Sequence, residues 1–210
     1  MDHATARASM VRFVDGLNVR FRDRYFVADG TLLGQVRDSG FIAGDNDIDF
    51  GMWIEDYDPR LVDDLRAAGF SLCHTWGRVE DGLVLQFGDG KTGIDITFFY
   101  RERDRTWSAV YSGGRQLRGS YPPFDLEPAT FLGIAVVRPA PPERYLETAY
   151  GKDWRYPISA WDYRYAPNHL RAVGPLWWRM KYAVKKARWR LRHGDIHIRP
   201  GAGSPKDEAE

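Results

Sequence analysis

The chain has 210 residues, of which 43% are hydrophobic, and its formal net charge is +1. These values fit one globular domain with a sizeable core, and the near-zero charge gives no global field that would attract nucleic acid. A single cysteine excludes an internal disulfide and any cysteine-based zinc site, and we expect neither a signal peptide nor a membrane span, which makes the cytoplasm the expected location.

The first elements predict a helix, a buried strand and a turn. Residues 5–22 carry apolar side chains at helical spacing, and residues 25–27 form a short apolar run typical of a buried strand. Gly30 and Thr31 then predict a strand-to-helix turn, with Thr31 as the N-cap of a short helix. Because glycine permits close backbone approach and a helix N-terminus offers free N–H groups, this turn is a candidate phosphate site.

Three aspartates predict a metal site. Residues 47–50 alternate charged and apolar, so on a strand Asp47 and Asp49 project from one face, about 7 Å apart. Asp95 lies in a second β-type run, 94–99, where a carboxylate is costly unless it meets a metal or a donor. Such hard oxygen ligands suit Mg²⁺ or Mn²⁺ bound together with substrate phosphates.

Asp45 lies on the loop that leads into this strand. Residues 45–49 superficially resemble a calcium-binding loop, but the required glycine at the sixth position and glutamate at the twelfth are replaced by Phe50 and Asp56. We therefore reject that interpretation. Asp45 is left with three roles: it binds the metal, orients a ligand or caps the turn.

The middle of the chain predicts alternating helices and hairpins. Cys73 and His74 are expected to be buried within one of its strands. The predicted elements are a helix over 55–69, a strand over 70–76, an antiparallel hairpin of 83–87 with 94–99, a hairpin of 106–111 with 116–118, a strand over 131–137 and a helix from 142 to 150.

Four blocks of the sequence resemble the LicD/fukutin-like family of the nucleotidyltransferase-fold superfamily. They are Gly-Thr-Leu-Leu-Gly-x-x-Arg at 30–37, Gly-Phe-Ile at 40–42, Asp-x-Asp-Ile-Asp at 45–49 and Tyr-Leu-x-x-x-Tyr-Gly-x-x-Trp at 145–154. The family often has Pro-Trp-Asp at positions 43–45, where this chain has Ala-Gly-Asp, in a loop expected to touch substrate.

The resemblance implies an α/β (α+β) nucleotidyltransferase (polymerase-β-like) fold, with a mixed central sheet flanked by helices and a C-terminal helical extension. We divide the chain accordingly into a catalytic domain (1–169), a basic aromatic helix (170–198) and a disordered tail (199–210).

The resemblance also implies roles for individual residues. Asp47, Asp49 and Asp95 would be catalytic and would hold the metal. Donor phosphates would contact a second group of residues, comprising Gly30, Thr31, Gly34 and Arg37, with Asp45 in the same loop region. For Arg37, the competing interpretation is a surface ion pair with Asp38 or Asp23.

The activity implied is transfer of phosphocholine or a polyol phosphate from a CDP-linked donor, with release of CMP, to a hydroxyl of a glycan or lipid-linked glycan of the cell envelope. The residues alone indicate only metal-dependent phosphoryl or nucleotidyl transfer. Two alternatives stay open: transfer of a nucleoside monophosphate with pyrophosphate release, and a non-catalytic module that binds glycan or choline.

The C-terminal third is aromatic and basic. The cluster Trp154, Tyr156, Trp161, Tyr163 and Tyr165 predicts either core packing or a box for a quaternary ammonium group. Residues 170–193 predict a helix with many Lys, Arg, Trp and Leu residues and no acid, which favours binding to an anionic membrane surface over nucleic acid. The competing interpretation is a solvated helix that docks through its tryptophans.

Overall fold

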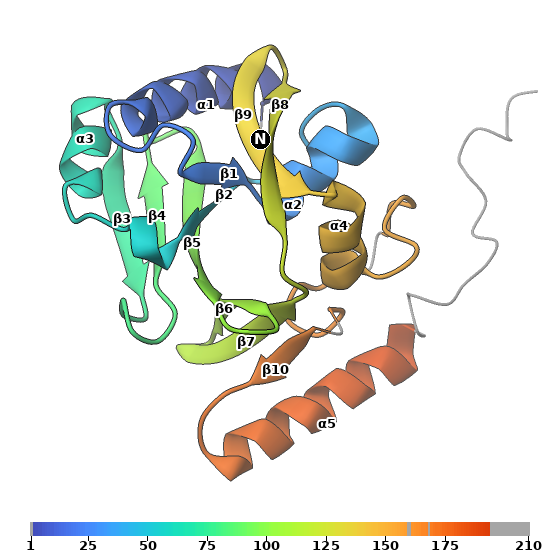
Figure 1. Ribbon diagram of the computed structural model, residues 1–210. Coiled ribbons are helices and arrows are strands. Elements are labelled where there is room, and N and C mark those ends of the chain that lie inside the picture. The colour runs from blue at the N-terminus through green and yellow to red at the C-terminus, as the bar shows by residue number, and fades with distance from the viewer. Residues whose placement is uncertain (1, 159–160, 168, 194–210) are drawn as a thin grey trace, which may run out of the picture.

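The computed structural model describes residues 2–158, 161–167 and 169–193 (Figure 1). The helices are α1 (His3–Asn18), α2 (Asp29–Leu33), α3 (Leu61–Ala67), α4 (Pro142–Tyr150) and α5 (Leu176–His193), with a π-helical turn, η1 (Gly34–Asp38), and a 3₁₀ turn, η2 (Ile54–Asp56). The strands are β1 (Tyr25–Val27), β2 (Asp47–Trp53), β3 (Ser71–Trp76), β4 (Val84–Gly88), β5 (Gly93–Arg101), β6 (Thr106–Ser112), β7 (Arg115–Tyr121), β8 (Asp125–Phe131), β9 (Ile134–Ala140) and β10 (Leu170–Ala172).

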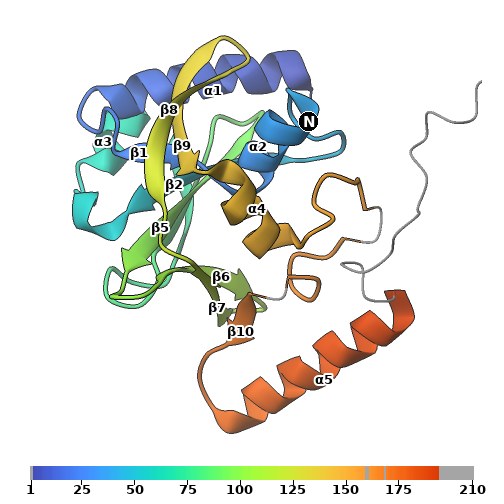
Figure 2. The ribbon, with the colours of Figure 1, turned by 45° about the vertical axis from the view of Figure 1, so that its right-hand side comes forward.

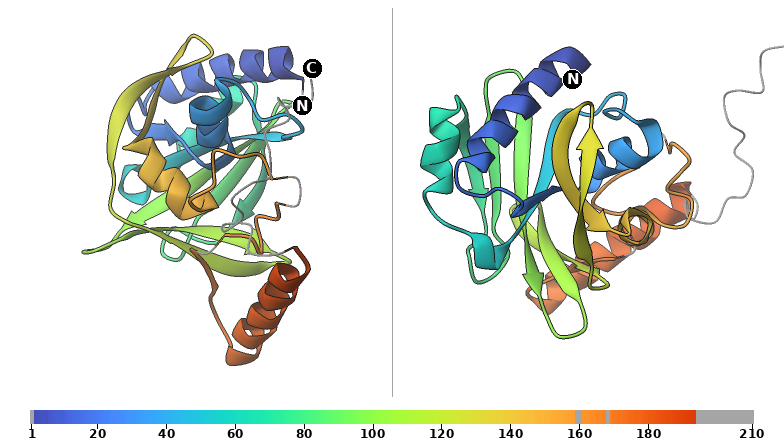
Figure 3. Two further views of the ribbon diagram at one scale, coloured as in Figure 1. Left: turned by 90° about the vertical axis from the view of Figure 1, so that its right-hand side faces the viewer. Right: turned by 45° about the horizontal axis from the view of Figure 1, so that its top comes forward.

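The central sheet is mixed, as the sequence predicted. Its strands follow the order β1-β2-β5-β6-β7-β10, and β4 pairs with both β3 and β5. Strands β2 and β5 are parallel, whereas their other neighbours pair antiparallel. Helices α1 and α3 lie to one side of the strands, and α2 lies on the other side with the β8–β9 hairpin (Figure 3, right). The predicted α/β class with a mixed sheet flanked by helices is confirmed.

The face of the sheet under α1 is filled by aromatic side chains. The Phe13 ring stacks on Phe50 of β2 with ring centroids 5.4 Å apart, and it meets Phe70 and Phe87 edge-on at 5.0 and 5.8 Å. Each such ring stabilises the fold by about 1.5–3 kcal/mol through burial. Since the apolar residues of β2 pack on this side, the alternating aspartates must project from the opposite face.

Three predicted helix starts are wrong. The short helix after β1 begins at Asp29 with Ala28 as its N-cap, because the Thr31 hydroxyl is engaged elsewhere: it accepts a hydrogen bond from the Asp49 N–H. The predicted helix over 55–69 is split, since Pro59 disfavours helical backbone at the residue before it, so that α3 starts only at Leu61.

The third error concerns the C-terminal segment. Residues Leu170–Ala172 form strand β10, which pairs antiparallel with β7, and only then does α5 begin. Gly174, at φ 110°, and Pro175 separate the two elements, because neither residue continues a helix well. The predicted domain boundaries stay predictions, and the proposed tail at 199–210 lies outside the described residues.

Cys73 and His74 are exposed, so their predicted burial is wrong. Both belong to β3, which hydrogen-bonds only to β4 among the described strands and is exposed along most of its length. Apolar neighbours in sequence suggested a core strand, but the position of β3 at the edge of the sheet overrides that local signal.

The predicted strand over 131–137 runs across the turn of a separate hairpin, β8–β9, because Phe131 ends β8 and Ile134 begins β9. Its tight turn places Leu132 at φ 50° and Gly133 at φ 78°. Strand β8 escaped prediction because most of its side chains are partly or fully exposed and Pro128 interrupts it. The hairpin contacts β1 and leads into α4, which closes the second face of the sheet beside α2 (Figure 2).

Candidate active site

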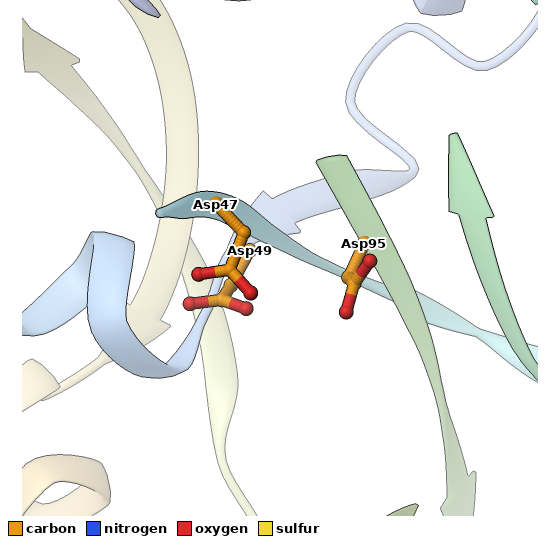
Figure 4. A group of neighbouring side chains, drawn as sticks. All are labelled: Asp47, Asp49 and Asp95. Atoms are coloured by element: carbon orange, nitrogen blue, oxygen red, sulfur yellow. The ribbon is translucent and has the colours of Figure 1, made fainter. Parts of the chain in front are cut away.

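The three predicted carboxylates meet at one point on the sheet. In the parallel pairing of β2 with β5, Asp49 lies opposite Asp95 and Asp47 lies opposite Gly93. Because neighbours in register project from the same face, all three side chains point the same way (Figure 4). One oxygen from each carboxylate lies within 4.8 Å of the other two. The structure thus brings together residues that lie far apart in the chain.

Burial makes this cluster electrostatically costly. It raises the pKa of Asp49 well above its ordinary value, and the charge of Asp47 adds to the effect. Burial also raises the pKa of Asp95 to about 6, even though a hydrogen bond with the Gln86 side chain lowers it. The pKa of Asp45 is raised to about 6 by burial and by the charge of Asp47. A bound cation would offset this repulsion.

The donor set fits a hard divalent cation. Asp95 Oδ1 is buried and has no hydrogen-bond partner within the described part of the chain, which leaves one ligand position unused. Three closely spaced carboxylate oxygens with no nitrogen or sulfur among them are the ligand type that Mg²⁺ and Mn²⁺ prefer. Asp47, Asp49 and Asp95 are therefore the residues that would hold the ion.

The turn after β1 positions the Asp49 carboxylate. The Gly30 N–H donates to Asp49 Oδ2 at 2.9 Å, and the Thr31 hydroxyl accepts from the Asp49 N–H at 2.8 Å. A Cβ on Gly30 would lie 2.9 Å from both Asp45 Oδ2 and Asp49 Oδ2. Glycine at position 30 therefore lets the backbone approach two carboxylates without displacing them.

Thr31 and Gly34 are closely packed within this turn. Thr31 is buried, and a Cβ on Gly34 would clash with the Gly40 carbonyl oxygen, so the chain packs closely there. Neither residue is among those that line the cavity described next. Their predicted contact with donor phosphates stays a prediction.

Substitution of Gly30 by alanine tests this arrangement. We expect turnover to fall about 100-fold, because the added methyl group displaces the Asp45 and Asp49 carboxylates and a shift of about 1 Å costs roughly that much. Gly40→Ala is the matched control, since a Cβ there meets only the Asp38 carbonyl oxygen at 3.8 Å. Equal activity of the two variants would contradict the role given to Gly30.

The carboxylates line a cavity of about 1060 Å³. Its lining includes the residues of the aspartate cluster and its loops, namely Asp29, Gly30, Arg37, Asp45, Asp47, Asp49 and Asp95. It also includes aromatic residues, among them Trp154, Tyr156, Trp161 and Tyr163. Its volume is ample for a nucleotide-sized ligand, and its lining combines carboxylates with aromatic rings.

The ion pair of Arg37 with Asp38 is confirmed, whereas its contact with donor phosphates stays a prediction. Its guanidinium makes a two-pronged ion pair with Asp38, at 2.9 and 2.7 Å, and its side chain is 12% exposed. It also lines the cavity. The ion pair with the neighbouring aspartate and a position beside the site are therefore compatible, and the pair keeps the guanidinium plane fixed.

Asp29 is a site residue that the sequence analysis missed. It lies directly before Gly30 at φ 38°, is partly buried, and accepts a hydrogen bond from the Tyr145 hydroxyl at 2.8 Å. Burial raises the pKa of Asp29, and the charge of Asp47 contributes. The signal in the sequence was its position after a buried strand and directly before a glycine turn, since binding and catalytic residues often lie on such connecting segments.

Buried aromatic side chains pack around Tyr145, the residue that holds Asp29. Tyr145 of α4 stacks on Tyr121 of β7, with centroids 4.7 Å apart, and the Tyr121 hydroxyl lies 3.1 Å from His169 Nε2. Gln86 is a further missed neighbour, which β4 places opposite Asp95. The predicted antiparallel hairpin of 83–87 with 94–99 already implies that Gln86 lies opposite Asp95.

The predicted aromatic cluster is largely engaged in packing. Trp154 is 4% exposed, Trp161 packs against Tyr150 with centroids 5.0 Å apart, and Tyr165 lies against Tyr182 at 6.0 Å rather than in the cavity. Arginines also lie over rings of the cluster: Arg155 over Trp154, and Arg164 over Tyr163 and Tyr165. A box for a quaternary ammonium stays a prediction.

Comparison with known proteins identifies a matching family model and several relatives. The family model described as LicD/FKTN/FKRP, nucleotidyltransferase domain, matches residues 22–141. The chain is 35% identical over 153 residues to ribitol-5-phosphate transferase FKTN of Mus musculus, which covers 71% of this chain and 33% of that protein. For the Homo sapiens protein of the same name the identity is 32% over 153 residues, with the same coverage.

A further relative is the uncharacterized protein T07A5.1 of Caenorhabditis elegans, which is 31% identical over 166 residues, or 72% of this chain and 43% of that protein. The chain spans about a third of the length of the ribitol-5-phosphate transferases that it matches.

Proposed function

Because the chain belongs to the LicD/FKTN/FKRP family, we propose that it transfers a phospho-substituent from a CDP-linked donor to a hydroxyl of a glycan or lipid-linked glycan. The observation that carries the proposal is the convergence of Asp47, Asp49 and Asp95 on the wall of a large cavity. The name of the relatives, ribitol-5-phosphate transferase, favours a polyol phosphate over phosphocholine as the substituent.

In the proposed reaction, the acceptor oxygen forms a bond to the phosphorus that carries the substituent. The bond from that phosphorus to the CMP oxygen breaks, CMP leaves, and a carboxylate of the site takes the hydroxyl proton. A divalent ion such as Mg²⁺ or Mn²⁺, when bound, supplies positive charge that neutralises the donor phosphates and lowers the pKa of the acceptor hydroxyl.

The residues of the chain have separate tasks in this proposal. Asp47 and Asp49 hold the ion, and Asp95 completes its site or receives the proton. The Gly30 N–H keeps the Asp49 carboxylate in place. Arg37, on the cavity wall, offers a fixed positive charge to the donor phosphates. Asp29, held by Tyr145, is a further carboxyl on the cavity wall.

Two measurements test the proposal. CDP-ribitol, CDP-glycerol and CDP-choline are screened for Mg²⁺-dependent thermal stabilisation, and the products are then identified. We expect a CDP-polyol to stabilise the protein by about 2.7 kcal/mol at a concentration near 100 times its Kd, and CMP to be released when acceptor is added. Pyrophosphate release from nucleoside triphosphates would instead show nucleotidyl transfer, and ligand binding without turnover would show a non-catalytic module.

We also propose that the protein acts at the inner face of the cell membrane, where lipid-linked acceptors of the cell envelope would be within reach. The exposed free thiol of Cys73 would stay reduced in that compartment.

A further inference from the structure

Helix α5 is attached to the domain by one face only. Trp178 and Tyr182 are buried against Leu117 of β7 and Leu170 of β10. The Tyr182 hydroxyl donates to the Arg164 carbonyl oxygen at 2.7 Å. Lys186, one turn further, donates to the Pro167 and Leu170 carbonyl oxygens at 2.5 and 3.1 Å. These contacts fix the rotation of α5 about its own axis. The helix lies beside β10 (Figures 1 and 2).

The opposite face of α5 is an apolar stripe that meets nothing in the described structure. Since a helix turns by about 100° per residue, its four members fall within an arc of roughly 80°, centred nearly opposite the attached face. The stripe consists of Leu176, Met180, Val184 and Leu191, which are 68%, 61%, 49% and 86% exposed. An apolar row of this kind is costly in water and points to a partner.

Basic residues border the stripe on both sides, and α5 contains no acidic residue. On the helical projection, Arg188 and Lys181 lie next to one edge of the stripe, with Arg192 and Lys185 further round on that side, and Arg190 and Arg179 lie next to the other edge. Trp177, 54% exposed, lies at the edge of the stripe with the Arg115 guanidinium 4.4 Å from its ring. Tryptophan at the boundary between an apolar and a charged zone is typical of helices at a membrane interface.

We propose that this outward face of α5 binds an anionic lipid bilayer, with the stripe inserted at the level of the acyl chains and the bordering lysines and arginines at the lipid headgroups. The charge pattern favours a bilayer over a second copy of the chain as the binding partner. In a pair formed by two copies of the chain, the stripes would bring rows of like charges together, which is unfavourable. A negatively charged bilayer satisfies both the apolar stripe and its basic borders.

The attachment of α5 also determines how far a bound membrane would lie from the cavity. Leu170, against which Trp178 and Tyr182 pack, lines the cavity together with His169. A bilayer on the far side of α5 would therefore lie one helix away from the cavity wall, which suits a lipid-linked acceptor. Within the described ranges, we find no helix with the length and apolar content needed to cross a bilayer, so binding would be at the surface.

This inference rests on the proposed place of action but not on the proposed transfer. Lipid binding is measured without donor, acceptor or turnover, so the two proposals can fail separately.

The test is co-sedimentation of the full chain with vesicles of phosphatidylcholine, with and without phosphatidylglycerol, at low and high salt. The stripe variant carries Leu176→Ser, Met180→Ser and Leu191→Ser, and a charge variant carries Lys181→Gln, Lys185→Gln and Arg188→Gln. The matched control carries three serines at exposed apolar positions outside α5: Val19→Ser, Leu72→Ser and Val79→Ser. Circular dichroism and thermal unfolding check that all variants are folded.

We expect the wild type and the control to bind anionic vesicles and to be released by salt, since the attraction is screened. The stripe variant should bind at least about tenfold more weakly, and the charge variant should lose the preference for anionic lipid. The proposal is overturned if the wild type binds no vesicles, or if the stripe variant partitions like the control. It is also overturned if light scattering shows a dimer that only the stripe variant dissociates, because the stripe would then belong to a second copy.

Discussion

Replacement of Asp47, Asp49 or Asp95 by asparagine is expected to lower turnover by at least about 10²–10³-fold, the usual cost of removing one preorganised electrostatic group. Each substitution removes a negative ligand oxygen from a cluster in which the three oxygens lie within 4.8 Å. Asparagine has nearly the same shape as aspartate, so the sheet should stay intact. The measurement is the rate of CMP release at saturating Mg²⁺, with circular dichroism as a check on folding.

Substitutions of two further aspartates serve as comparisons for these three variants. Asp125→Asn, at an exposed position of β8 away from the cavity, should leave turnover unchanged. Asp45→Asn should have an intermediate effect, because Asp45 lines the cavity but is not one of the three clustered ligands. Wild-type activity of any of the three main variants at low Mg²⁺ would remove that residue from the metal site.

The same substitution at position 95 is expected to stabilise the protein when no metal is present. Burial raises the pKa of Asp95 from 3.8 to about 6, so at neutral pH the charged form is disfavoured in the folded state by about 3 kcal/mol. A neutral asparagine removes that penalty, and its side-chain oxygen can still accept from Gln86. For a domain of this size we expect the Tm of the metal-free Asp95→Asn variant to rise by roughly 5–10 °C.

The pH dependence has a definite sign. With a folded-state pKa above the unfolded one, Asp95 favours folding below about pH 4, and this contribution is lost as the pH rises through about 6. The metal-free wild type should therefore lose stability between about pH 4 and 6, whereas Asp95→Asn should lose less. Added Mg²⁺ should stabilise the wild type above pH 6 and have little effect on the variant. If Asp95→Asn is less stable than the metal-free wild type, burial does not disfavour the charged form of Asp95 as inferred.

The aspartate cluster was predictable because strands impose a period of two. The alternation at 47–50 fixed which face the first two carboxylates share, and the Gly-rich hairpin placed Asp95 on an inner strand. What that pattern does not contain is the parallel pairing of β2 with β5, a contact between distant segments that puts Asp49 opposite Asp95. Here the family resemblance supplied the missing step, and the structure agrees with it.

The errors arose where tertiary contacts override local signals. Thr31 looks like an N-cap, but its hydroxyl serves the Asp49 N–H, a partner eighteen residues away. Cys73 and His74 have the neighbours of a core strand, but they lie on the sheet's edge. Asp29 was overlooked because its importance depends on Tyr145, which approaches it from α4.

The most direct measurement is the anomalous difference density of Mn²⁺ in a crystal soaked with the metal. A shared ion should appear as a peak within about 2–2.3 Å of an oxygen from each of Asp47, Asp49 and Asp95, the range for a hard divalent cation on carboxylates. A peak that excludes Asp95, or manganese found only elsewhere on the protein, would contradict a metal-dependent transferase built on these three side chains.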